Sequence, residues 1–185
     1  MFASHSRFFE KIIKNSILCF IMKYMDKFIA HKSEDGPKTQ SLTEHLENVA
    51  KKAALFAASF NNADWAFYAG ILHDLGKADS DWQKYIRGEK STLVNHSEAG
   101  AQFAFSKMNP HDPAAKIIPY LIAGHHAGLP DWYENCGNSL KSILADVDTS
   151  YLEKLLNDSN IQSVCNAAFP KSDRKRTRLN SSHIT

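Results

Sequence analysis

The segment that most constrains this chain is an apolar stretch that ends in a histidine and an aspartate. Residues 65–72 are largely apolar and would bury the turn that follows them, which holds His73 and Asp74. Imidazole suits borderline transition metals, and a carboxylate can bind one ion or bridge two. Gly76 is expected to end the helix, and Lys77 would project a cation beside the site, where a phosphate could meet it. A single His-Asp pair is common, so its meaning depends on the residues that accompany it.

Apolar residues recur at helical spacing through the middle of the chain. Thr39 or Ser41 is expected to cap a helix whose apolar stripe includes His45. Further helices are predicted over residues 63–75, 79–87, 95–108, 113–125, 138–144 and 151–156, and residues 28–37 have the turn chemistry of a loop. Because no stretch alternates apolar and polar residues convincingly, the predicted fold class is all-α, a helical bundle.

Length and composition fit one domain between two atypical ends. A chain of 185 residues, 43% of them hydrophobic, can bury one core, which we assign to residues 25–170. Residues 1–24 form an N-terminal extension whose apolar run is too short to span a bilayer and lacks a small-residue cleavage site. This extension is either an extra amphipathic helix or sequence upstream of the natural start. Residues 171–185 form a basic tail, either a nucleic-acid arm or, as we favour, a solvated or foreign segment.

Charge and cysteine content bear on the cellular compartment in which the protein works. The formal net charge of +2 does not by itself indicate nucleic acid. Cys19, Cys136 and Cys165 are widely spaced, odd in number and without a C-x-x-C pair. Reduced thiols fit this pattern better than a disulfide framework or a thiolate zinc site. We therefore expect a cytoplasmic protein with no membrane partner.

Histidines supply the other candidate metal ligands. His45 is expected to point inward from its helix, His96 lies at the start of a later helix, and His125 and His126 form a doublet. Helical bundles build internal sites from such inward faces and helix ends. Adjacent side chains on a continuing helix point about 100° apart. A helix that ends before Gly128 would let both rings of the doublet reach one centre.

Each of these residues also has an ordinary structural interpretation. An inward histidine such as His45 is more often a hydrogen-bonded core residue than a ligand, and His96 can simply begin a helix. We interpret His5, His31, His111 and His183 as surface or loop residues, Asp79 and Asp81 as cap and surface groups, and Trp82, Tyr85 and Phe103 as core. The order of the remaining residues within one short helical domain nevertheless favours a metal site. In chain order they are His45, His73-Asp74 with Gly76-Lys77, His96, and His125-His126.

That order and its local contexts resemble the HD superfamily of metal-dependent phosphohydrolases, and within it most closely the HD nuclease domain of the CRISPR-associated type I nuclease-helicases. The likeness covers roughly residues 28–155. It is carried by Ile29-Ala30-His31-Lys32-Ser33, by Gln40-Ser41-Leu42-Thr43-Glu44-His45-Leu46, by Leu72-His73-Asp74-Leu75-Gly76-Lys77 with Trp82-Gln83-Lys84-Tyr85-Ile86, by Asn95-His96-Ser97 with Gly100-Ala101, and by Gly124-His125-His126-Ala127-Gly128.

The resemblance implies an enzyme that hydrolyses phosphodiester bonds of single-stranded DNA in CRISPR interference, with a helicase domain or subunit and a guide-RNA surveillance complex as partners. It implies one or two divalent ions. Asp74 would bridge two ions, with His45 and His73 on the first and His96, His125 and His126 on the second, and Lys77 would steady the scissile phosphate. Mixed imidazole and carboxylate ligands suit Mn²⁺, Co²⁺, Ni²⁺ or Fe²⁺ better than Mg²⁺.

The chain also departs from the pattern of these nucleases. They usually supply a further aspartate to the first ion from a downstream helix, and the nearest candidates here, Asp146 and Asp148, lie too early and match poorly. No Gly-Lys-Ser/Thr phosphate loop occurs, so we expect a stand-alone nuclease subunit or the front piece of a longer nuclease-helicase. Two alternatives stay open: a nucleotide phosphohydrolase, although Arg87 is the only arginine between positions 8 and 173, and a non-catalytic module that docks partners or holds a structural ion.

Overall fold

The computed structural model describes residues 27–33, 37–92, 95–126, 128–132 and 139–145, and over these residues the fold is mostly helical. The α-helices are α3 (Leu42–Ala57), α4 (Ala63–Leu72), α5 (Ser80–Arg87), α6 (Ser97–Lys107), α7 (Ala114–Ala123) and α8 (Leu140–Ala145). Two short 3-10 helices follow α3 and α4, namely η1 (Ala58–Phe60) and η2 (Leu75–Ala78). The predicted all-α bundle is confirmed. The predicted helix over 151–156, the two chain ends, and Asp146 and Asp148 lie outside the described residues.

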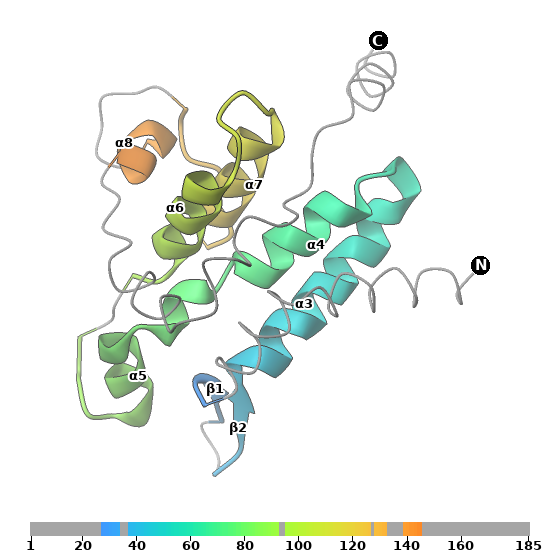
Figure 1. The fold of residues 1–185 in the computed structure, drawn as a ribbon. Coiled ribbons are helices and arrows are strands. Elements are labelled where there is room, and N and C mark those ends of the chain that lie inside the picture. The colour runs from blue at the N-terminus through green and yellow to red at the C-terminus, as the bar shows by residue number, and fades with distance from the viewer. Residues whose placement is uncertain (1–26, 34–36, 93–94, 127, 133–138, 146–185) are drawn as a thin grey trace, which may run out of the picture.

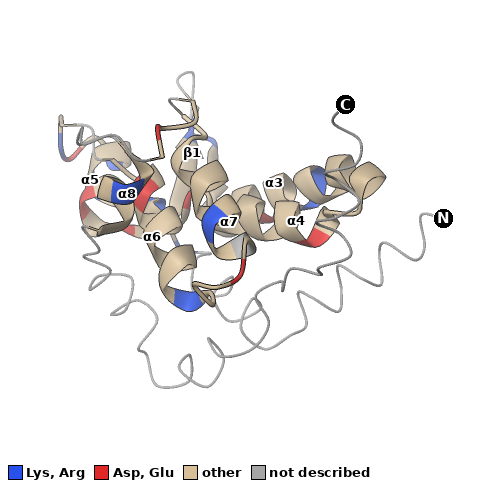
Figure 2. Ribbon diagram, turned by 90° about the horizontal axis from the view of Figure 1, so that it is seen from above, with Lys and Arg blue, Asp and Glu red and all other residues tan. Residues whose placement is uncertain are grey.

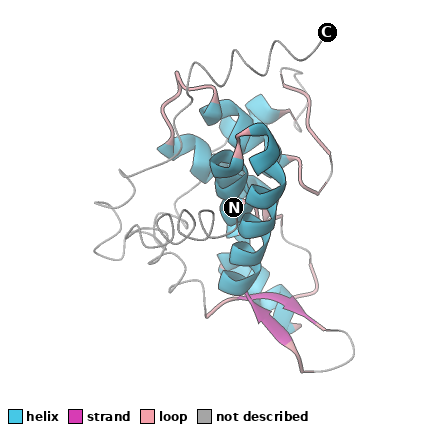
Figure 3. Cartoon of the chain, turned by 90° about the vertical axis from the view of Figure 1, so that its right-hand side faces the viewer, coloured by secondary structure: helices cyan, strands magenta, loops and turns pink. Residues whose placement is uncertain are grey.

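One part of the prediction was wrong: the expected loop before α3 contains a small β-hairpin. Strand β1 (Ile29–Lys32) pairs antiparallel with β2 (Thr39–Ser41), with Ile29 opposite Ser41 and His31 opposite Gln40 (Figure 3). Strands of three and four residues are too short to show an alternating pattern in the sequence. The hairpin runs directly into α3, which begins at the residue after β2. The Leu42 amide donates to the Phe28 carbonyl at 2.8 Å and so ties the start of the helix to the residue before β1.

Two helix starts agree with the capping residues in the sequence, whereas α6, expected to start at residue 95, has His96 as its N-cap. Ser41 caps α3, since its hydroxyl accepts from the Glu44 amide at 3.2 Å, and Asp79 caps α5 by accepting from the amides of Asp81 and Trp82. Helix α4, in contrast, ends at Leu72 rather than at residue 75. The backbone leaves the helical conformation at Asp74, with φ −109° and ψ 20°, so Gly76 lies inside η2 and does not end the helix.

The core lies between two pairs of helices. Helices α3 and α4 pack side by side, α6 packs against α7, and α4 contacts both members of the second pair (Figure 1). Buried residues from all four helices and η2 form one cluster, including Leu46, Phe67, Leu75, Phe103 and Ile118. The ends of α4, α6 and α7 therefore meet next to the inner face of α3. Across the described segments, no helix has both the length and the apolar character needed to cross a bilayer.

A glycine sets the distance between α3 and α4. A Cβ atom on Gly70 would lie 2.6 Å from Cα and 2.9 Å from the amide nitrogen of Ala50, so only glycine permits this approach of the two backbones. Replacing glycine by alanine in an ordinary helix stabilises it by about 1 kcal/mol. Here we expect Gly70→Ala to lower the free energy of unfolding by roughly 1–3 kcal/mol, because overpacking forces the helices apart. Urea denaturation measures the sign, and a stabilised variant would contradict the close contact.

Candidate metal centre

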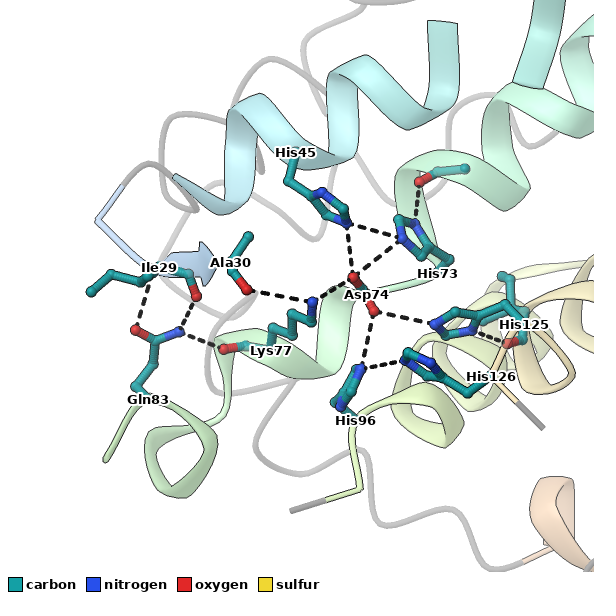
Figure 4. A network of polar contacts seen from close by, with 12 residues as sticks. Ile29, Ala30, His45, His73, Asp74, Lys77, Gln83, His96, His125 and His126 are labelled. Atoms are coloured by element: carbon teal, nitrogen blue, oxygen red, sulfur yellow. Dashed lines mark hydrogen bonds and ion pairs between the residues drawn. The ribbon is translucent and has the colours of Figure 1, made fainter. Parts of the chain in front are cut away.

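Side chains from four separate parts of the chain converge on the carboxylate of Asp74. His45 comes from the inner face of α3, and His73 directly follows α4. His96 is the N-cap of α6, and His125 and His126 follow α7 (Figure 4). Asp74 itself is only 3% exposed, although it carries a charge. The structure thus brings together every residue that the sequence singled out as a metal ligand.

The two oxygens of Asp74 face different sets of histidines. Oδ2 lies 2.9 Å from His45 Nε2 and 3.2 Å from His73 Nε2. These two nitrogens are themselves 3.2 Å apart. Oδ2 and the two imidazoles therefore form one compact group of donor atoms, which we call the first position.

Oδ1 faces the second set. It lies 3.2 Å from His96 Nε2 and 3.2 Å from His125 Nε2. His126 joins this set through its Nε2 atom, which lies 2.8 Å from His96 Nε2. The doublet reaches one centre because α7 ends at Ala123 and the chain turns, which leaves the two rings 4.1 Å apart between centroids. We call this group the second position; Asp74 is common to both.

Backbone carbonyls determine which ring nitrogen of two histidines points into the centre. His73 Nδ1 lies 2.7 Å from the Gly70 carbonyl oxygen, and His125 Nδ1 lies 2.6 Å from that of Ile122. A carbonyl oxygen can only accept, so each Nδ1 carries its proton. In the neutral ring the lone pair is then on Nε2, the atom that faces Asp74. Metal-binding histidines are commonly oriented by a hydrogen bond of this kind.

This arrangement fits divalent cations. Lone pairs on His73 Nε2 and His125 Nε2 face an ionised carboxylate at 3.2 Å, and neutral rings can only repel it there. The contacts become favourable when the rings are protonated or when a cation lies between the donors. The donor atoms of Asp74, His96, His125 and His126 all lie within 4.8 Å of one another, as a shared ion requires. The cluster can therefore hold a divalent metal.

The charges around Asp74 keep it ionised. Without a cation, burial alone would raise its pKa, but the hydrogen bonds that protonated rings of His125, His45, His73 and His96 donate outweigh burial and hold the pKa of Asp74 well below its usual range. Burial lowers the pKa of His125, but the hydrogen bond to Asp74 prevails and leaves it raised. Burial and the neighbouring His125 and His96 lower the pKa of His126. An ionised carboxylate and unprotonated imidazoles are the forms that bind metals.

Lys77 also faces this carboxylate. Its Nζ lies 2.9 Å from Asp74 Oδ2 and 3.4 Å from the Ala30 carbonyl, and 5.2 Å from the centre of the Trp82 ring. The side chain is 5% exposed. The lysine thus lies at the centre as expected but points inward, where it offsets the charge of Asp74. Its contact with a phosphate stays a prediction.

The N-terminus of α6 approaches Asp74 because of a second glycine. A Cβ atom on Gly76 would lie 2.2 Å from the carbonyl oxygen and 2.8 Å from Cα of His96. Any side chain at residue 76 would push η2 and α6 apart and carry His96 away from Oδ1. The Gly-Lys pair therefore contributes twice to the centre, through this backbone contact and through the lysine charge.

One histidine that we interpreted as a surface residue lies at the centre. His31 is exposed, but its ring lies 4.6 Å from that of His45 between centroids. Its donor atom is within 4.8 Å of those of His45 and Asp74. Burial and the neighbouring Lys77 lower its pKa. The hint in the sequence was its place in the Ile29–Ser33 segment that carried the family resemblance.

The remaining predictions for individual residues agree with the structure where they can be checked. Trp82 and Phe103 are buried, at 4% and 2% exposure, and Tyr85 is half-buried. Asp81 forms exposed ion pairs with Lys84 and Lys90, and His111 is exposed. His5 and His183 lie outside the described residues.

Comparisons with known proteins place this centre in a family. The model of the HD domain matches residues 42–176, which include the centre from His45 to His126. The chain is also 30% identical over 115 residues to the CRISPR-associated nuclease/helicase Cas3 of Haloferax volcanii. That alignment covers 58% of this chain and 12% of the relative, so the chain spans about an eighth of its length. The chain belongs to the HD domain family, within the superfamily of metal-dependent phosphohydrolases.

Proposed function

We propose that this chain is a metal-dependent nuclease domain that hydrolyses phosphodiester bonds of single-stranded DNA in type I CRISPR interference. The observation that carries the proposal is the position of the Asp74 carboxylate, whose two oxygens each face a separate set of imidazoles. Two neighbouring ion positions suit a phosphodiester, because attacking and leaving oxygens both need their charge stabilised. The likeness to the Haloferax volcanii nuclease/helicase supports a nuclease, and the single-stranded DNA substrate comes from the family resemblance of the sequence.

In this proposal His45 and His73 hold the first ion, and His96, His125 and His126 hold the second, with Asp74 shared between them. With these residues holding them, divalent ions would supply a hydroxide near neutral pH and would stabilise negative charge on a phosphate. The donor set favours Mn²⁺, Co²⁺, Ni²⁺ or Fe²⁺ over Mg²⁺. The hydrogen bonds from the rings of His73 and His125 to backbone carbonyls keep both Nε2 atoms aimed at the ions.

Lys77 would act by offsetting negative charge, first on Asp74 and then on a bound phosphate. Its ammonium group lies against Asp74 Oδ2, inside the buried centre, so it reduces the cost of keeping that carboxylate ionised there. When cations occupy the centre, Asp74 no longer requires this partner, and the ammonium group becomes available for a phosphate oxygen. We propose that this exchange is how Lys77 steadies the scissile phosphate.

Recognition of DNA would depend on the centre and on partners. In Figure 2 basic and acidic segments are interspersed over the described helices. A helicase domain or subunit and a guide-RNA surveillance complex would deliver the single strand. This division of tasks agrees with the name of the relative, a CRISPR-associated nuclease/helicase.

Incubation of the full chain with Mn²⁺ or Ni²⁺ and circular single-stranded DNA tests the proposal. We expect endonucleolytic cleavage that a chelator abolishes, and little hydrolysis of mononucleotides or cyclic nucleotides. A panel of these nucleotides in parallel distinguishes a nuclease from a nucleotide phosphohydrolase. A chain that binds metal stoichiometrically but cuts no DNA would refute the nuclease assignment, and release of phosphate from a nucleotide would support the alternative.

A further inference from the structure

We infer that His31 is a third imidazole ligand of the first position, and that the hairpin is part of the metal centre. The inference rests on the proposed function, because it presumes that the first position holds a divalent ion. Its basis is the placement of the His31 donor atom within 4.8 Å of those of His45 and Asp74. The HD domain match begins at residue 42, so it does not include this histidine.

The hairpin directs His31 towards the centre through an irregularity in its pairing. Ile29 pairs with Ser41 and His31 pairs with Gln40, so Ala30 is an extra residue in β1. Bulges of this type re-aim neighbouring side chains and occur often beside active sites. Ala30 is completely buried, and its carbonyl receives the Lys77 ammonium group. The bulge thus anchors the strand on the core next to the ring of His31.

A buried glutamine holds this strand against the metal centre. Gln83, on α5, is 3% exposed. Its Oε1 accepts from the Ile29 amide at 3.1 Å, and its Nε2 donates to the Ile29 carbonyl at 3.0 Å and to the Lys77 carbonyl at 2.7 Å (Figure 4). One amide group therefore ties β1 to η2, the element that carries Lys77. Gln83 is a positioning residue for His31.

His31 makes the two positions equivalent in donor content. Without it, the first position has two imidazoles and one carboxylate oxygen, whereas the second has three imidazoles and the other oxygen. With it, each position has three imidazoles and one oxygen of Asp74. His31 would thereby supply the donor that similar nucleases take from a downstream aspartate. His31 is exposed, so a ligand from this side leaves the first ion near the surface, where a strand can reach it.

Titration of the metal-free full chain with Co²⁺, followed by visible absorption and calorimetry, tests the inference without an activity assay. We expect the wild-type chain to bind two ions. His31→Ala should bind the second ion as before but the first at least about tenfold more weakly, with weaker d–d absorption. His31→Gln, which keeps a polar side chain of similar size, should show the same weakened binding of the first ion as His31→Ala. His111→Ala removes an exposed histidine elsewhere and should bind both ions normally.

The outcomes separate this inference from the proposed function. If the wild-type chain binds no Co²⁺, the two-ion proposal itself fails. If it binds two ions and His31→Ala binds both with unchanged affinity, only the role of His31 is refuted. As a further check, His126→Ala should weaken the second ion at least about tenfold and leave the first unchanged, and combining it with His31→Ala should weaken both.

The role of Gln83 can be measured in the same titration. Gln83→Met keeps the volume but removes the hydrogen bonds to Ile29 and Lys77, together with the one that Gln83 accepts from Arg87, so we expect weaker binding of the first ion in the wild-type background. If Gln83 acts through His31, the same change should have no further effect on the first ion in His31→Ala. Equal losses in the two backgrounds would refute the positioning role and indicate general destabilisation.

Discussion

Asp74→Asn is expected to remove bound metal from both positions and to lower nuclease activity by at least about 10³-fold, because among the described residues the Asp74 carboxylate is the group common to the two proposed positions. The amide keeps the shape of the side chain but has no negative charge, and one of its two terminal atoms carries protons that cannot face an ion. Elemental analysis of the purified variant measures metal content, and cleavage of circular single-stranded DNA measures activity. Circular dichroism shows whether the helices survive.

A matched substitution exists on the surface. Asp81→Asn makes the same chemical change at a carboxylate whose partners are Lys84 and Lys90. It should leave metal content and cleavage unchanged. A folded Asp74→Asn variant that keeps both ions and full activity would refute the bridge. A variant that loses metal and unfolds, in a chain whose wild type cuts no DNA, would instead indicate a structural ion.

Removal of metal is expected to give the second-largest effect, a loss of thermal stability. An ion at a concentration one hundred times its dissociation constant stabilises the folded state by about 2.7 kcal/mol. For a domain of this size we expect a fall in Tm of roughly 5–10 °C on chelation. The physical reason is that the Nε2 lone pairs of neutral His73 and His125 then face the Asp74 carboxylate without a cation between them. Differential scanning fluorimetry with Mn²⁺ and with EDTA measures the shift.

The Asp74→Asn variant serves as the control for this experiment as well, because its Tm should not respond to Mn²⁺. Mg²⁺ should protect the wild-type chain less than Mn²⁺ at equal concentration, since it binds imidazole poorly. Identical melting curves with Mn²⁺ and with EDTA would show that the histidine cluster binds no ion under these conditions. That result would also remove the basis for assigning the two positions.

Much of the centre could be predicted because its residues lie on regular helices or directly beside their ends. His45 shares the apolar stripe of α3, and helical periodicity alone indicates that such a residue points inward. The doublet could be assigned to one centre since a helix that ends before Gly128 lets neighbouring rings turn together. The local chain around His73 and Asp74 was predicted less well. The extension of α4 to residue 75 was wrong, because polar contacts around Asp74, which no local pattern reveals, favour the non-helical turn.

The sequence by itself indicated the helical class, the capping residues of α3 and α5, and five of the imidazoles around Asp74. The tertiary structure alone decided how those groups divide between the two oxygens of Asp74, and that His31 lies among them. The physical reason is that both results depend on contacts between segments distant in the chain. The contact of Gly76 with the backbone of His96 sets how close His96 lies to Asp74. The hydrogen bonds between Gln83 and the backbone of Ile29 set how close His31 lies to the centre. A short hairpin has no periodicity of its own, so only its packing on α5 and η2 shows where it lies.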